Sequence, residues 1–378
     1  MRRAVVAGAL AQRPGRGGHA WALLQYVLGL RELGWDVLFV DRLDTTMCGG
    51  AAIADSAELR WLESVMRGFG LEGAWSVLHD GGAFGVPRER LVGFARRADV
   101  LLNVMGYLDD DDVLDAVALR VFVDIDPGFP QMWCALGLVD PFAGHDAFVT
   151  VGENVGDPSC AVPTCGLEWI TTPQPVTLGE WDAFPVDGGS LSSVVSWRGP
   201  YGPVTYGGVT YGLRAHQFRR FADLPRRTGH AIELALDIDA ADEPDRAALE
   251  AAGWRLADPR AVAGDPWRYR DYVRRAQAEL MVAKDMYVRS RCGWFSDRSI
   301  CYLASGRAVI AQDTGLEDLG EGVLAFGDVD EAAEAVARVA ADPRRHGAAA
   351  RALAEERFAA ARVLPRLFDR LGVSACVA

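Results

Sequence analysis

The sequence predicts an α/β protein built from two doubly wound domains. The first observation is length, because 378 residues exceed what one hydrophobic core normally supports. The second is that continuous apolar strands alternate with helical patterns in both halves of the chain, as in parallel sheets covered on both faces. The third is the stretch 157–190, rich in Pro, Gly, Thr and Ser, which interrupts the pattern and is typical of an interdomain linker.

Composition and charge narrow the classes of partner. Half of the residues are apolar and 24% are charged, a balance typical of globular proteins. The net charge of −13 argues against nucleic acid or an anionic membrane surface as the main partner. The apolar run near the N-terminus is too short for a secretory signal. No apolar stretch in the sequence approaches the roughly 20 residues that span a bilayer. We therefore expect a cytoplasmic protein without a membrane span.

The seven cysteines are an odd number and are scattered along the chain, which suits reduced thiols better than a disulfide framework. Cys160 and Cys165 are the closest pair, but no second Cys/His pair stands at zinc-ligand spacing. We expect no metal site.

The first half opens with a βαβ pattern. An apolar strand at residues 3–10 leads into a glycine-rich turn, a helix at 20–33 and a second apolar strand at 35–41. The turn reads GRGG and lacks the full dinucleotide fingerprint, so it supports NAD binding only weakly. Further helices are expected at 58–69, 88–97 and 112–118, and strands at 100–104, 120–125 and 147–151.

The second half repeats the alternation. Strands are expected at 193–197, 231–236, 254–256, 280–283, 308–312 and 322–326, with a hairpin inside 199–212. Helices are expected at 215–224, 245–252, 267–278, 330–340, 344–358 and 362–371. We place the domains at 1–185 and 186–355, and expect residues 356–378 to form a C-terminal helix that packs back on the first domain.

One stretch, residues 284–315, indicates an anion site. A helix that begins at Ser296 or Asp297 presents free backbone N–H groups and the positive end of its dipole to whatever precedes it. Lys284, Arg291 and Arg298 lie close by in sequence. These groups predict a seat for a diphosphate; the competing interpretation is an ordinary capped helix with solvated arginines.

Two segments resemble the GT-B glycosyltransferases, in particular the family 1 and family 4 types of actinobacterial enzymes. GRGGHAWALLQYVLGLRELGWDVLFVD (15–41) is similar to the GG-x-helix-LxxxGHxV opening, and GWFSDRSICYLASGRAVIAQDTG (293–315) is similar to the ExxxxxxxEAxxxGxPVIxxxxGG segment. Residues 296–299 stand where retaining families show their first glutamate, and Tyr302 where the second usually stands. The resemblance implies two Rossmann-like domains that face a central cleft, the first binding the acceptor and the second the sugar donor.

This resemblance implies a metal-independent hexosyltransferase that takes a nucleotide diphosphate sugar as co-substrate and uses no cofactor. Negative charge that accumulates on the leaving diphosphate would then be stabilised by helix N-termini, glycine N–H groups, Arg and Lys. The candidate donor-binding residues are Gly17, Gly18, Arg198, Lys284, Trp294, Ser296, Arg298, Ser299, Gln312, Asp313 and Thr314. For several of them a cap, a turn or a surface salt bridge is the competing interpretation.

The acceptor hydroxyl must also lose a proton, and two residues stand at suitable positions. His19 follows the first glycine pair and Asp126 follows the strand at 120–125, so each is a candidate general base. A helix-start histidine and a turn aspartate before Pro127 are the alternatives. Asp124 and Asp126 also match the metal-binding DxD of GT-A glycosyltransferases, but the two-domain pattern argues against that fold.

The leading hypothesis is sugar transfer to a small soluble acceptor, with secondary-metabolite biosynthesis as the favoured setting. A nucleotide-sugar epimerase of the same fold and a non-catalytic two-domain binding protein are the alternatives, and an oxidoreductase would need a nicotinamide site. No nucleic acid partner is expected, and a homodimer is one possible oligomeric state. Donor base, acceptor, stereochemistry and the identity of the general base are also left open at this point.

Overall fold

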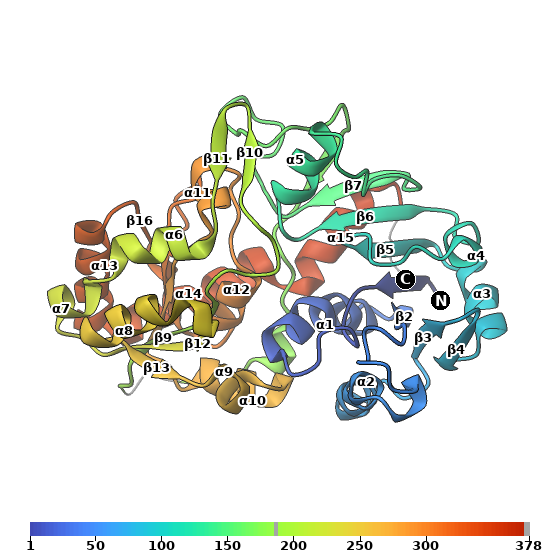
Figure 1. The fold of residues 1–378 in the computed structure, drawn as a ribbon, viewed down its shortest axis with the longest axis horizontal. Coiled ribbons are helices and arrows are strands. Elements are labelled where there is room, and N and C mark those ends of the chain that lie inside the picture. The colour runs from blue at the N-terminus through green and yellow to red at the C-terminus, as the bar shows by residue number, and fades with distance from the viewer. Residues whose placement is uncertain (185–187, 374–378) are drawn as a thin grey trace.

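The computed structural model describes residues 1–184 and 188–373. Two α/β domains lie side by side, the first around an eight-stranded sheet and the second around a six-stranded one, and the C-terminal helix ends beside the first domain (Figure 1). Among these residues no helix is long and apolar enough to cross a bilayer. The predicted boundary between residues 185 and 186 lies outside the described residues.

The first sheet has the order β4-β3-β2-β1-β5-β6-β7-β8, and all neighbours are parallel except β3 and β4. From β1 the chain runs to β2 on one side, and from β5 to β6 on the other, so a topological switch point lies between β1 and β5. The strands are β1 (Arg3–Ala7), β2 (Asp36–Arg42), β3 (Trp75–His79), β4 (Gly82–Gly85), β5 (Val100–Val104), β6 (Arg120–Asp124), β7 (Ala147–Thr150) and β8 (Trp169–Thr171).

The second sheet has the order β13-β12-β9-β14-β15-β16 and is parallel throughout its described strands. Its switch point lies between β9 and β14. The strands are β9 (Leu191–Ser196), β12 (Ile232–Asp237), β13 (Arg255–Ala257), β14 (Ala278–Met281), β15 (Ala308–Gln312) and β16 (Val323–Phe326), and a separate antiparallel hairpin consists of β10 (Val204–Tyr206) and β11 (Val209–Tyr211).

Helices connect the strands in both domains. In the first they are α1 (Gly17–Glu32), α2 (Ala57–Gly68), α3 (Arg88–Ala95), α4 (Asp111–Leu114) and α5 (Phe129–Ala135). In the second they are α6 (Arg214–Phe218), α7 (Leu224–Thr228), α8 (Glu243–Ala251), α9 (Pro259–Ala263), α10 (Pro266–Arg274), α11 (Asp285–Ser290), α12 (Asp297–Ala304), α13 (Val329–Ala341) and α14 (Pro343–Leu353), followed by α15 (Ala360–Arg370).

Alternate strand residues enter different hydrophobic clusters, which shows that both faces of each sheet are covered. On β1, Ala4 and Val6 belong to one cluster and Val5 and Ala7 to another. The second sheet divides in the same way between its two faces. This burial on both sides explains why the strands read as continuous apolar runs rather than as alternating ones.

Several predicted elements differ from the structure. The stretch 157–190, predicted as a linker, contains the short strand β8, which extends the first sheet beside β7. The strands β3 and β4 and the helix α5 were not predicted. The single helix expected at 215–224 is interrupted, because α6 ends at Phe218 and α7 begins at Leu224. Proline- and glycine-rich surroundings hide these short elements from periodicity.

The C-terminal helix α15 packs on α1 of the first domain. Gly29 of α1 permits the contact, since a Cβ there would lie 2.7 Å from Cβ of Ala360 and 2.9 Å from Cδ1 of Leu364. Nearby, the rings of Trp35 and Phe368 stack with their centroids 4.7 Å apart. The last helix therefore ties the end of the chain to the first domain.

We expect Gly29→Val to lower the free energy of unfolding by about 1–3 kcal/mol, because the added side chain overpacks the contact between α1 and α15. Gly93→Ala is the matched control: Gly93 is also helical, but a Cβ there meets open space, so this change should stabilise α3 by about 0.5–1 kcal/mol. Chemical denaturation of both variants measures the difference. Equal stability of the two would contradict the packing described here.

Candidate functional site

A cavity of about 790 Å³ lies between the two domains, within the range of about 300–1,000 Å³ usual for small-molecule sites. The first domain contributes the loop after β1, the start of α1 and the residues that follow β5 and β6. The second domain contributes the end of β9, the start of α6, the residue after β14 and the start of α12. The cavity therefore joins the switch points of both sheets, where ligands of open α/β sheets bind.

The start of α12, where the sequence predicted a diphosphate seat, forms part of the cavity wall. Ser296 is the N-cap, and its hydroxyl accepts a hydrogen bond from the backbone N–H of Arg298 at 3.2 Å. Ser296, Asp297 and Arg298 line the cavity. The positive end of the α12 dipole thus favours negative charge here, and Asp297 already supplies one carboxylate.

Arg298 is an ion-paired residue rather than a free cation. Its guanidinium binds the fully buried Glu279 of β14 and donates a hydrogen bond from Nη1 to the carbonyl of Val194 at 2.9 Å. Burial by itself lowers the pKa of Arg298, but the charge and hydrogen bond of Glu279, together with Tyr269 and Tyr302, raise the pKa above its usual value. The pair therefore neutralises most of the charge that the sequence assigned to diphosphate binding.

Arg214, at the start of α6, is the cation that sequence reasoning missed. Its side chain is buried and makes no ion pair with any described residue; Nη1 donates one long hydrogen bond, 3.4 Å, to the carbonyl of Ser196. Burial, followed by the charge of Arg298, lowers the pKa of Arg214 to about 10. A buried, unpaired guanidinium is costly, so an anion in the cavity would stabilise it.

The buried polar atoms without partners in this wall are all N–H donors. Among the cavity-lining residues that the structure describes, they are Nε of Arg214, Nε1 of Trp294 and Nη2 of Arg298. Unsatisfied buried donors cost free energy and call for a specific explanation. This wall of the cavity is therefore rich in hydrogen-bond donors.

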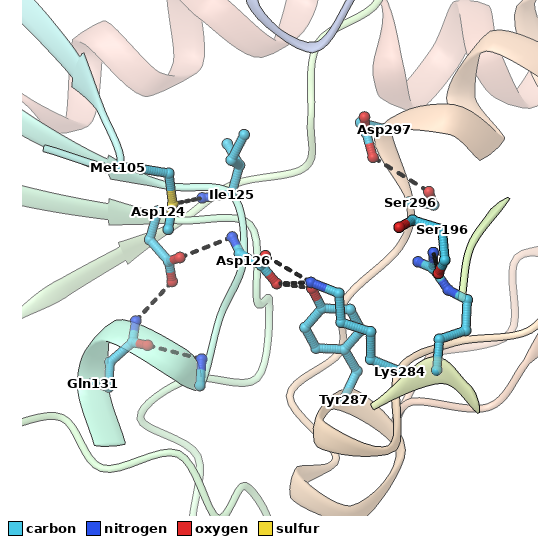
Figure 2. A network of polar contacts seen from close by, with 12 residues as sticks. Met105, Asp124, Ile125, Asp126, Gln131, Ser196, Lys284, Tyr287, Ser296 and Asp297 are labelled. Carbon is cyan, nitrogen blue, oxygen red and sulfur yellow. Dashed lines mark hydrogen bonds and ion pairs between the residues drawn. The ribbon is translucent and has the colours of Figure 1, made fainter. Parts of the chain in front are cut away.

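Lys284 and Asp126 join the two domains across the cavity (Figure 2). The ammonium of Lys284 lies 2.7 Å from both carboxylate oxygens of Asp126, and the hydroxyl of Tyr287 donates to the same carboxylate. Phe129, Tyr201 and Tyr287 surround the ammonium, with ring centroids 4.9, 5.6 and 5.3 Å away. Burial lowers the pKa of Lys284, and Asp126 opposes that shift.

Asp124 fixes the position of Asp126. One oxygen of Asp124 accepts the backbone N–H of Asp126 at 2.9 Å, and the other accepts a hydrogen bond from Gln131 at 2.7 Å (Figure 2). The second oxygen also accepts a hydrogen bond from Thr150 at 2.8 Å. Burial raises the pKa of Asp124 to about 6. Both carboxylates of the Asp124-x-Asp126 motif are therefore engaged within the protein, and no group of three or more His, Cys, Asp or Glu within residues 1–184 and 188–373 could hold a metal ion.

His19 lines the cavity from the first turn of α1. Its Nε2 lies 3.0 Å from the carbonyl of Ala9, which can only accept, so Nε2 carries the proton and Nδ1 carries the lone pair. Burial, together with the charges of Arg13 and Arg16, lowers the pKa of His19 to about 4. The imidazole is neutral near pH 7 and can accept a proton at Nδ1.

No protein-family model and no curated protein sequence matches the chain, but solved structures match it along almost its whole length. An alpha-glucosyltransferase in complex with UDP and a 13-mer DNA aligns with TM-score 0.60 and 10% identity, covering 98% of this chain and 99% of that one. Alr3699/HepE of Anabaena, in complex with UDP-glucose, aligns with TM-score 0.57 and 11% identity, covering 99% and 100%. AviGT4, a glycosyltransferase involved in Avilamycin A biosynthesis, aligns with TM-score 0.55 and 12% identity, covering 98% and 97%. The chain has the GT-B fold.

The glycine pair of this GT-B chain lies at the domain interface. Gly17 and Gly18 line the cavity, and a Cβ on Gly17 would lie 2.2 Å from the carbonyl oxygen of Asp265 in the second domain. A Cβ on Gly18 would lie 2.9 Å from the ring of Tyr269. The two glycines therefore allow the start of α1 to reach the opposite domain.

The other predicted donor-binding residues divide into two groups. Trp294 lines the cavity, and its ring stacks on Tyr287 with centroids 4.2 Å apart. The structure does not bring the second group to the cavity: Arg198, Ser299, Gln312, Asp313 and Thr314.

Each residue of the second group has another role or setting. Arg198 is half-exposed and paired with Asp242, and the hydroxyl of Ser299 is buried. The remaining three lie at the carboxyl end of β15, one strand away from the switch point. The side chain of Gln312 accepts a hydrogen bond from the N–H of Ala283. The carboxylate of Asp313 accepts from the N–H groups of Gly315 and Leu316. The hydroxyl of Thr314 donates to the carbonyl of Trp294. Tyr302 is also buried away from the cavity, with its hydroxyl 2.8 Å from Ser192.

The two buried arginines should respond differently to the same substitution. Arg298→Met leaves Glu279 buried without a partner and should cost about 3–5 kcal/mol of unfolding free energy. Arg214→Met removes a buried charge that has no carboxylate partner, so the stability of the ligand-free protein should stay level or rise. Chemical denaturation without ligand measures both, and equal losses for the two variants would show that Arg214 is paired in solution.

Proposed function

We propose that this protein is a metal-independent glycosyltransferase that moves a sugar from a nucleotide diphosphate donor to a small soluble acceptor. The observation that carries the proposal is the buried, unpaired guanidinium of Arg214 at the switch point of the second sheet. The unsatisfied donors of Trp294 and Arg298 lie in the same wall. A diphosphate supplies the negative charge that Arg214 lacks, and this wall offers it donors rather than acceptors.

The comparison structures support this ligand class. The alpha-glucosyltransferase was solved with UDP and Alr3699/HepE with UDP-glucose, and both share the fold along its full length. In the present chain the start of α12 and Arg214 would hold the diphosphate. The first domain would then present the acceptor from the side of His19.

The reaction that this arrangement suits is displacement at the anomeric carbon of the donor sugar. The acceptor oxygen forms a bond to that carbon, the bond to the diphosphate oxygen breaks, and the acceptor proton passes to Nδ1 of His19. Arg214 and the free N–H groups of α12 stabilise the charge that develops on the diphosphate. Asp126 is less suited to accept the proton, because both of its oxygens are engaged by Lys284.

A role in secondary metabolism is part of the proposal and is supported by AviGT4, which is involved in Avilamycin A biosynthesis. The proposal also includes a cytoplasmic location. A nucleotide-sugar epimerase of the same fold would use the same donor site. Incubation with donor alone distinguishes the two, since only an epimerase would release an isomerised sugar without acceptor.

A thermal-shift screen of UDP, TDP, GDP and ADP tests the donor site. We expect one of them to raise the melting temperature, because a ligand that binds only the folded state stabilises it. Arg214→Met should abolish most of that shift and weaken the affinity by about 10- to 100-fold, the usual worth of a charge-assisted contact. Arg198→Met is the control, since Arg198 lies outside the cavity, and no shift with any of the four would reject the donor site.

His19 is tested by kinetics. We expect His19→Ala to lower kcat by about 10²- to 10⁴-fold while nucleoside diphosphate affinity stays within about twofold, because a general base acts on the chemical step. In the unaltered enzyme kcat/KM should rise through about pH 4 and then level off, since His19 is unprotonated above its pKa. His230→Ala, outside the cavity, is the control. Full activity of His19→Ala would show that another group acts as the general base.

A further inference from the structure

The ion pair between Lys284 and Asp126 stands where a bound diphosphate would need a cation. Lys284 follows β14 at the switch point and lines the same cavity as Arg214 and the start of α12. The positive charge of Arg214 and the negative charge of Asp297 both act on Lys284. Yet two of the three N–H groups of its ammonium are directed to one carboxylate, that of Asp126.

The two partners differ in how firmly they are held. Asp126 is fixed on the first domain, because its backbone N–H donates a hydrogen bond to Asp124. Its carboxylate also accepts a hydrogen bond from Tyr287 of α11 in the second domain. Lys284 carries its charge on a flexible four-carbon stem. Lys284 can therefore change partners by rotating its side chain, and Asp126 would keep the hydrogen bond from Tyr287 after losing it.

We propose that Asp126 is an internal competitor for Lys284, and that it holds the ammonium until a donor diphosphate displaces the carboxylate. The inference rests on the proposed function, because it takes the nucleoside diphosphate as the incoming anion. A diphosphate carries more negative charge than one carboxylate and sits closer to Arg214, so it wins the exchange. Breaking the buried pair then consumes part of the donor's binding free energy.

Donor binding also changes the connection between the domains. The pair links the loop after β6 in the first domain to the start of α11 in the second (Figure 2). Once Lys284 turns to the diphosphate, the ionic part of that link is lost, only the hydrogen bond from Tyr287 of α11 still joins Asp126 to the second domain, and a carboxylate without its cation faces the acceptor side. The pair thus couples donor occupancy to the electrostatics of the acceptor side.

The test is the affinity of Asp126→Asn for whichever of UDP, TDP, GDP and ADP stabilises the protein most, measured by calorimetry. Asparagine keeps the size and an acceptor for Tyr287 but has no charge to hold Lys284. We expect affinity to rise about tenfold, whereas Lys284→Met lowers it about 10-fold or more. In the Lys284→Met background, Asp126→Asn should add nothing, because the competitor then has no cation to withhold.

Asp237→Asn is the matched control. Asp237 also lines the cavity and also pairs across the domains, with Arg16 at 2.9 Å, but it does not touch Lys284. Its affinity change should stay within about twofold, which separates competition from the mere loss of a negative charge. Three results would each overturn the inference while leaving the proposed function intact. Asp126→Asn could bind the nucleotide no more tightly than the unaltered protein, Asp237→Asn could show an equal gain in affinity, or the gain could persist in the Lys284→Met background. Failure of all four nucleotides to bind the unaltered protein would reject both.

Discussion

Buried positive charge at the carboxyl edge of the second sheet is the constraint on which the cleft depends. Arg298, Arg214 and Lys284 all lie in this region with little exposure, and only Arg298 and Lys284 have carboxylate partners among the described residues. Burying a third cation contributes nothing to folding, because its desolvation is not offset by a counter-charge. A buried charge without a partner breaks the rule that buried charges are paired, and such exceptions are expected where a ligand completes the site.

The close approach of the two domains follows from residues without side chains. Gly17 and Gly18 bring the start of α1 against the second domain, and any side chain on Gly17 would overlap the backbone of Asp265. The glycine-rich turn therefore shapes the cleft as well as supplying N–H groups to it. Because the same turn precedes His19, the position of the proposed base depends on this contact between the domains.

The sequence was sufficient for several of the fully buried strands, although the buried strand β3 was missed. The strand expected at 100–104 is β5 without any shift of its ends, since an apolar run buried on both faces is unambiguous. The strand β8 was missed because three residues among prolines and glycines carry no periodicity. Its place beside β7 is set by tertiary contacts that no local pattern encodes.

The candidate site was predictable where its residues are contiguous. Lys284, Trp294, Ser296 and Arg298 fall within one short stretch, and all four line the cavity. Arg214 lies about 70 positions earlier and stands in no motif; only the fold places it beside them. The partners of Lys284 and Arg298 were equally hidden, because an ion pair between Lys284 and Asp126 depends on how the two domains meet.

Electrostatics separates the two candidate bases in a way that spacing could not. Asp126 is engaged by Lys284, whereas His19 has no partner at Nδ1 among the described residues. The pKa of His19, about 4, is low for a base that works near pH 7. Part of that depression comes from the charges of Arg13 and Arg16. A diphosphate in the cavity would offset these charges and raise the pKa of His19, since a nearby negative charge favours the protonated form. The donor would therefore strengthen the base that its own transfer requires, and kcat, which reports on the occupied enzyme, is the quantity in which this effect is expressed.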